Sequence, residues 1–180
     1  MKYLSCAETA KLIRQALKQN FPLIKFSVYC KRGGSINVTW NNGPTTKQVD
    51  KIAGQFEGSG FDGMQDLSYP IEHYITKDGT VCLAEIHHNL DHKKFEAPPD
   101  SEKVQFGSRF VFCYRNISPQ YTKEVAEKIA NDYGLDAQIE IKRSGLGGDY
   151  CEVPYTHLSS NYSKTLNQAV NDWFNEIDLT

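Results

Sequence analysis

Residues 25–40, KFSVYCKRGGSINVTW, consist of two runs of alternating side chains joined by a turn of basic residues and glycines. One face of the first run carries Phe26, Val28 and Cys30, and one face of the second carries Ile36, Val38 and Trp40. A repeat of two residues is typical of a strand, and a Gly-Gly pair suits a tight turn. The stretch therefore predicts a β-hairpin with one apolar face.

Amphipathic helices are predicted on both sides of this hairpin. Before it, Ser5–Glu8 match a capping box, in which each of the two side chains bonds the other residue's backbone N–H group. The apolar side chains that follow recur at helical spacing as far as Pro22. After the hairpin, Gly43-Pro44 breaks the strand, and residues 49–56 carry apolar side chains at i, i+3, i+4 and i+7. The hairpin can thus bury its apolar face beneath both helices.

The next part of the chain is predicted to hold a glycine-rich loop, a strand pair and a linker. Glycines in residues 57–64 allow a tight loop that returns Phe61 and Met64 to the core. Residues 69–76 and 80–87 are predicted strands joined by a Lys-Asp-Gly turn. Residues 89–103 are polar and without periodicity, which is typical of a long loop.

The second half repeats the order of the first. After a strand over residues 106–115, Ser118-Pro119 predicts the start of a helix that Gly134 ends. Residues 137–142 and 150–155 are predicted strands around a glycine-rich turn, and residues 163–177 a last helix. The recurrence favours a pseudo-repeat, with chance similarity between amphipathic segments as the alternative.

The predicted fold class is α+β, with two αββα-like units, antiparallel sheets and helices packed on one face. Residues 1–90 are expected to form the first unit, residues 91–104 a linker or mobile loop, and residues 105–180 the second unit. Hydrophobic residues make up 39% of the 180, which is enough for a buried core. Exposed strand edges of the hairpins can pair with a second copy of the chain, so a homodimer is an alternative to a monomer.

Composition narrows the functional classes. The formal net charge is −2, whereas proteins that bind nucleic acid by charge alone carry a basic excess, so any such contact is expected to be local. Five cysteines without a C-x-x-C spacing fit reduced thiols in a cytoplasmic protein. The sequence carries no apolar run long enough for a membrane span, so no membrane association is expected.

Three motifs in fixed order carry a family resemblance: SINVTW at residues 35–40, GPT at 43–45 and FEGSGFDGMQDL at 56–67. Together they resemble the large polyvalent protein associated domain numbered 29, which occurs in phage and plasmid proteins that travel with DNA into a new host. The resemblance covers residues 1–90 best and extends to residues 115–118. It carries over no catalytic residues. It implies a small accessory protein in the bacterial host cytoplasm that blocks a restriction or CRISPR system by binding it.

Two groups of residues are candidates for binding. In the glycine-rich loop the candidate partner-binding residues are Glu57, Phe61, Asp62 and Asp66, with a structural role for the loop as the alternative. Its three carboxylates could also serve acid-base chemistry or bind a hard cation, but an exposed acidic loop is favoured. The candidate nucleic-acid-binding residues are Lys31, Arg32, Arg115, Lys142 and Arg143. Glycines beside the two basic turns expose amides to phosphates, and Arg115 offers a stacking surface, with ordinary hairpin tips as the alternative. The sequence thus predicts a non-catalytic accessory protein that inhibits a host defence protein by stoichiometric binding, or alternatively one that binds nucleic acid.

Enzymatic and cofactor motifs are weak in this sequence. Residues 58–63 match G-x-G-x-x-G in letters, but the dinucleotide motif needs a preceding strand and a following helix. His88 and His92 have the i, i+4 spacing of helical metal ligands, but their segment opens a polar loop, which favours solvated histidines. The sequence shows no recognisable Ser-His-Asp set, so an enzymatic function is an alternative that the sequence disfavours. Neither a metal nor a cofactor is predicted.

Overall fold

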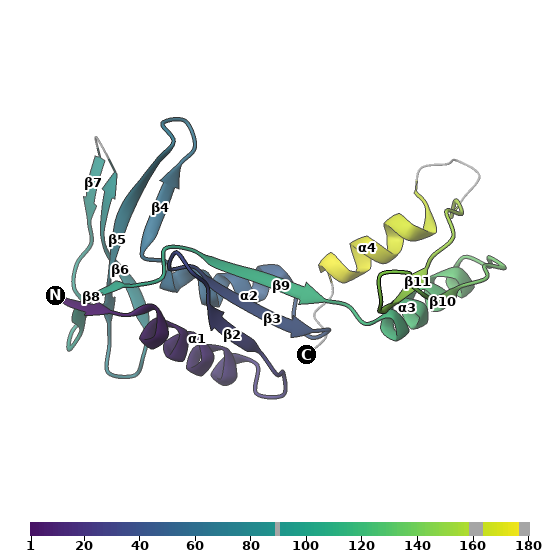
Figure 1. The fold of residues 1–180 in the computed structure, drawn as a ribbon, viewed down its shortest axis with the longest axis horizontal. Helices are drawn as coiled ribbons and strands as arrows, with labels where there is room; N and C mark the ends of the chain where they lie inside the picture. Colours follow the sequence, from purple (N-terminus) through teal and green to yellow (C-terminus); the bar gives the residue numbers. More distant parts are fainter. Residues whose placement is uncertain (89–90, 159–163, 177–180) are drawn as a thin grey trace. The chain divides into compact units, whose positions relative to one another are not determined.

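The structure, a computed structural model, describes residues 1–88, 91–158 and 164–176, which form two compact units (Figure 1). Unit 1 contains residues 1–40 and 46–114. Unit 2 contains residues 41–45 and the described residues from Arg115 onward. The division falls at Tyr114 and Arg115, and it differs from the expected linker at residues 91–104.

The predicted hairpin and its two helices form the first part of unit 1. Strands β2 (Ser27–Cys30) and β3 (Ile36–Asn41) pair antiparallel, and β9 (Val111–Asn116) completes a three-stranded sheet in the order β2-β3-β9. Helix α1 (Cys6–Asn20) precedes the hairpin, and α2 (Thr46–Ala53) follows it with a 3-10 turn, η1 (Gly54–Phe56). The capping box of α1 is confirmed, since Ser5 N–H donates to Glu8 at 2.8 Å and Ser5 Oγ accepts from Glu8 N–H at 3.3 Å.

One buried cluster joins these helices to one face of the sheet. The alternate residues of β3 that the sequence places on one face are buried there together with residues of both helices. Its fully buried members include Ile13 and Leu17 of α1, Ile36 and Val38 of β3, and Val49 and Ala53 of α2. On the other face of the sheet Tyr29 of β2 is partly exposed, whereas Asn37 opposite it on β3 is buried.

A second sheet completes unit 1. It has the order β1-β8-β5-β6-β7, from β1 (Lys2–Leu4), β8 (Glu102–Phe106), β5 (Leu67–Ile75), β6 (Val81–His88) and β7 (Asp91–Lys94), and β4 (Ser59–Asp62) also pairs with β5. The predicted β5–β6 pair is confirmed. Strands β1 and β8 run parallel, so the sheet is mixed and not purely antiparallel as expected.

Two stretches predicted as loops contain strands. The glycine-rich stretch forms β4, and its expected return of Phe61 and Met64 to the core is wrong, since 55% and 97% of these side chains are exposed. Extended pairing with β5 turns Phe61 outward, and Met64 lies beyond the end of β4. The stretch 91–104 contains β7 and the start of β8, where Val104 and Phe106 are buried between partner strands that are distant in sequence.

The backbones of Gly58 and Gly107 lie in a tight crossing that joins the two sheets. Gly58 N–H donates to the Ser108 carbonyl at 2.7 Å, and Ser108 Oγ donates to the Phe56 carbonyl. A Cβ atom on Gly58 would lie 2.1 Å from the Phe106 carbonyl oxygen, and one on Gly107 would lie 2.5 Å from that of Leu4. Only glycine fits such approaches.

Unit 2 repeats the order helix, strand, strand, helix. It contains α3 (Pro119–Asp132), β10 (Glu140–Arg143), β11 (Asp149–Glu152) and α4 (Leu166–Glu176) around its own buried cluster. Ser118 caps α3 as predicted, accepting the Tyr121 N–H at 3.3 Å. The predicted ends of the last helix, residues 163 and 177, lie outside the described residues.

The α+β class is confirmed, and the order helix, strand, strand, helix recurs in both units, with the mixed second sheet added in unit 1. In the part of the chain that the structure describes, every helix is too short or too polar to cross a membrane. Pairing of strand edges in a homodimer stays a prediction.

We expect Gly58→Ala to lower the free energy of unfolding by about 2–4 kcal/mol, because the added methyl group must displace backbone at the crossing. Gly54→Ala is the matched control, since its Cβ would meet only the Asp50 side chain, at 3.8 Å and beyond. Chemical denaturation followed by Trp40 fluorescence measures both variants. Equal stability of the two would show that the crossing is not tight.

Candidate functional site

The hairpin formed by β4 and β5 carries exposed apolar side chains at its tip. Phe61, Met64 and Leu67 are 55%, 97% and 47% exposed. Phe61 is paired with Ser68 and Leu67 with Asp62, so the two apolar side chains lie on opposite faces of the hairpin, with Met64 in the turn between them. Figure 1 shows this turn extending away from the helices of unit 1. Several exposed large apolar side chains at one projecting tip are typical of a protein-binding element.

Hydrogen bonds hold the turn at this tip in one conformation. Asp62 Oδ1 accepts the N–H groups of Met64 at 2.9 Å and Gln65 at 3.3 Å, which is an Asx-type turn. Asp62 Oδ2 lies 2.8 Å from His88 Nε2 on β6. The Met64 amide and the His88 ring keep the pKa of Asp62 below its ordinary value. Asp66 then takes the left-handed conformation, with φ +54°, that closes the turn.

The base of the hairpin depends on an aromatic ring lying across a glycine. Tyr69 packs so closely over Gly60 that a Cβ atom on Gly60 would lie 2.2 Å from the ring. The same ring meets His88 edge to face at 4.8 Å between centroids. An aromatic side chain over a cross-strand glycine stabilises such a pair, which explains why glycine occurs inside β4.

Glu57 does not belong to this tip, although the sequence groups it with the other loop residues. Its Oε1 accepts the Val111 N–H at 2.7 Å at the start of β9, and burial raises the pKa of Glu57. The structure thus brings Phe61, Asp62 and Asp66 together on the hairpin and leaves Glu57 in a supporting role. Met64 and Leu67 were missed; the available signal was an apolar side chain at each end of the polar Gln65-Asp66 pair.

The basic residues named from the sequence lie in both units. Lys31 and Arg32 are exposed in the β2–β3 turn of unit 1, whereas Lys142 and Arg143 are exposed on β10 of unit 2. Lys142 forms an ion pair with Glu152 on the neighbouring strand. These residues therefore form two separate groups, one in each unit.

Arg115 has a structural role within unit 2. Its guanidinium donates to the carbonyl groups of Asn42 at 3.2 Å, Gly43 at 2.6 Å and Phe174 at 2.5 Å. Three carbonyl acceptors occupy the fork that would contact a phosphate. These bonds give Arg115 a structural role, and its assignment as a nucleic-acid-binding residue stays a prediction.

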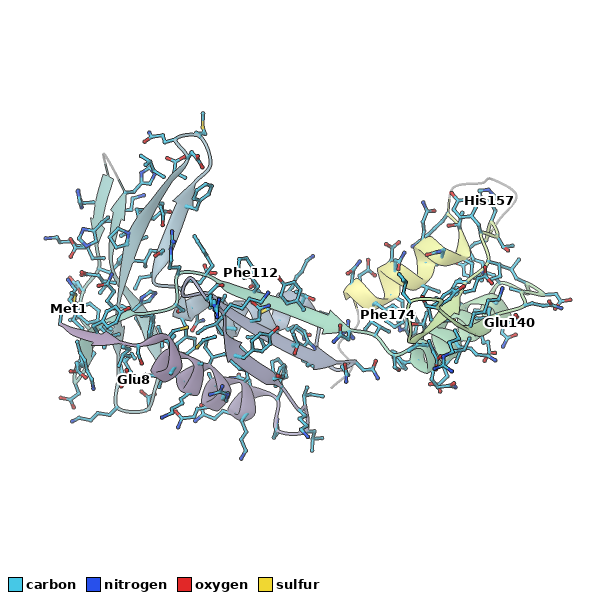
Figure 2. The ribbon with its side chains drawn as sticks, in the orientation of Figure 1. Met1, Glu8, Phe112, Glu140, His157 and Phe174 are labelled. Carbon is cyan, nitrogen blue, oxygen red and sulfur yellow. The ribbon has the colours of Figure 1, made fainter. Side chains whose placement is uncertain are left out.

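The outer face of the three-stranded sheet carries a row of aromatic side chains. Tyr29, Phe112 and Tyr114 are 43%, 45% and 48% exposed, and the Phe110 ring lies 6.4 Å from that of Phe112. Arg109 lies over the Phe110 ring at 5.9 Å. Figure 2 shows Phe112 on the side of β9 away from α1, the helix that carries Glu8. Alternation of aromatic residues at 110, 112 and 114 was the sequence signal for this face.

We expect Arg115→Lys to lower the free energy of unfolding of unit 2 by about 1–3 kcal/mol, because an ammonium group cannot reach three carbonyls in a planar fork. Thermal unfolding followed by Trp173 fluorescence reports on this unit. Arg143→Lys, at an exposed position of β10, is the control with unchanged stability. A loss no larger than the control's would contradict the structural role.

Comparison with known proteins gives one family. Residues 4–118, more than half of the chain, match the family model described as large polyvalent protein associated domain 29. The match contains both the hairpin tip and the aromatic face, and it ends at Ser118, the residue that caps α3. No curated protein and no solved structure matches the chain.

Proposed function

The chain belongs to the family of large polyvalent protein associated domain 29, and from this membership we propose that it is a non-catalytic accessory protein that binds a partner protein through the β4–β5 hairpin. The family associates the chain with phages and other mobile elements. The observation that carries the proposal is the ordered tip, in which Phe61, Met64 and Leu67 are exposed on a turn fixed by Asp62.

Physical chemistry favours such a tip as a binding element. Large apolar side chains that enter a partner's pocket supply most of the binding energy of typical interfaces. The fixed turn lowers the entropic cost of binding, since the loop needs little further ordering. The exposed Asp66 beside these side chains adds a polar contact at the rim.

The proposed partner is a host defence protein, a component of a restriction or CRISPR system, bound stoichiometrically in the bacterial cytoplasm. The support for this choice is the family's association with mobile elements, because such elements meet host nucleases when they enter a cell. A non-catalytic inhibitor acts only while it is bound to its target, so this role requires tight binding.

We expect the chain to raise plasmid or phage entry into hosts that carry one matching restriction or CRISPR system, and not into hosts without it. Phe61→Ser combined with Met64→Ser should reduce this protection about tenfold or more, since the apolar anchors are lost. Leu23→Ser is the control, because Leu23 is 93% exposed but lies outside the hairpin. If the doubly substituted chain still raises plasmid or phage entry, the hairpin's role is overturned. If the unsubstituted chain raises entry into none of the hosts that carry a defence system, the choice of partner is overturned.

Nucleic-acid binding is the second candidate function, and the aromatic face favours it. Exposed aromatic rings on a sheet provide stacking surfaces for single-stranded bases. Lys31 and Arg32 lie in the turn that joins two strands of this same sheet, where they can contact phosphates. This candidate uses unit 1 alone and does not require Arg115.

If this second function holds, Phe112→Ala combined with Tyr114→Ala should weaken binding of a fluorescent oligo-dT strand about tenfold or more, because two stacking rings are removed. Lys31→Glu should weaken binding. It should also reduce the slope of the logarithm of the binding constant against the logarithm of the salt concentration by about 1, the value for one lost phosphate contact. Fluorescence anisotropy at several salt concentrations measures both, with Phe61→Ser as control. Absence of binding by the unsubstituted chain at low salt would refute this candidate.

A further inference from the structure

One face of the second sheet carries a compact cluster of charged and histidine side chains. Its members are Glu72 on β5, Glu85 and His87 on β6, His92 and Lys94 on β7, and Lys103 on β8. Lys103 and the buried Val104 are neighbours in β8, and neighbouring side chains of a strand point to opposite faces. The cluster therefore lies on the face of the sheet away from the apolar core. The carboxylate side chains are little exposed, at 13% for Glu72 and 11% for Glu85. The function proposed above does not use these residues.

Strand register determines which histidines meet. His87 lies directly opposite His92 across β6 and β7, and their rings are 5.3 Å apart in an edge-to-face arrangement. His88 points to the other face and contacts Asp62, so His88 and His92 do not share a face, and the helical pairing that the sequence disfavours does not form. His73 packs against Phe106, where burial lowers the pKa of its ring to about 4.

We propose that Glu85, His87 and His92 form a binding site for a divalent transition-metal ion, with Zn²⁺ as the best fit. One ligand atom from each residue lies within 4.8 Å of the other two. Two imidazole nitrogens and one carboxylate oxygen are a common zinc ligand set, and they leave a fourth position for water. A tetrahedral zinc ion holds its ligand atoms about 3.4 Å apart, so small side-chain rotations close the site.

The buried nitrogen of His87 supports this assignment independently of the ligand spacing. Its Nε2 is shielded from solvent and has no hydrogen-bond partner among the described residues. It lies 3.8 Å from Glu85 Oε1 and 3.7 Å from Glu72 Oε1, farther than a hydrogen bond. A shielded imidazole nitrogen without a hydrogen bond is costly, and a bound metal ion would satisfy it.

The two lysines of the cluster leave one carboxylate oxygen for the metal. Lys103 Nζ lies 3.0 Å from Glu85 Oε2 and also pairs with Glu72, so it orients Glu85 and leaves Oε1 toward His87. Lys94 Nζ lies 3.7 Å from that Oε1 but is 76% exposed, so its ammonium can move into solvent when a cation binds. Lys94 is thus a competitor for the same oxygen, and its removal should strengthen metal binding.

Titration calorimetry with Zn²⁺ on tag-free full-length chain, in a Cys30→Ser background that removes the exposed thiol, tests the site. We expect one equivalent of Zn²⁺ to bind. His92→Ala should weaken binding about tenfold or more, and Lys94→Ala should strengthen it several-fold. His88→Ala is the matched control, since it removes the neighbouring histidine on the opposite face. His92 is exposed, so its replacement leaves the fold intact, which an unchanged melting temperature of the metal-free variant verifies.

A second readout identifies the ligands directly. Co²⁺ in place of Zn²⁺ should give the visible absorption of a tetrahedral site without the near-ultraviolet band of thiolate ligation. No saturable binding by the unsubstituted chain, or equal binding by the His92→Ala and His88→Ala variants, would overturn the site. These outcomes are independent of partner binding by the hairpin.

Discussion

The hydrogen bond from Gly58 N–H to the Ser108 carbonyl, 2.7 Å long, is the contact on which the binding surfaces of unit 1 depend. It forms where two backbone segments cross so closely that Gly58 and Gly107 have no room for side chains. From one segment the chain enters β4 and the exposed hairpin. The other segment connects β8 to β9, the strand that carries the outward aromatic row. Both surfaces therefore start from a single rigid crossing.

The two surfaces differ in the chemistry that they offer. The hairpin tip combines Phe61, Met64 and Leu67 with acidic side chains, so it suits an apolar pocket on a protein and repels a polyanion. The sheet face combines aromatic rings with the basic β2–β3 turn, which suits stacked bases and phosphates. The single family match supports neither chemistry over the other. The ordered turn around Asp62 favours the hairpin, because such a turn costs little entropy on binding.

Local sequence rules predicted what depends on neighbouring residues. The Ser5–Glu8 capping box, the Gly33-Gly34 hairpin and the Ser118 cap all follow from side chains within a few positions of each other, and all are confirmed. Strands β4, β7 and β8 were missed because their stability comes from pairing: Val104 of β8, for example, lies against His73 and Lys2. The candidate site was predicted only where its residues are neighbours in sequence. Phe61, Asp62 and Asp66 lie close in sequence, whereas the carbonyls around Arg115 and the strand opposite His87 come from distant segments.

The central claim, that the hairpin tip binds a protein, is tested most directly by photo-crosslinking inside host cells. A benzophenone amino acid replaces Met64, and in a parallel chain it replaces Leu146, which is 100% exposed on unit 2 and controls for exposure. The account predicts one discrete protein adduct from position 64 that position 146 does not give. Crosslinks to nucleic acid alone, or the same adducts from both positions, would contradict it.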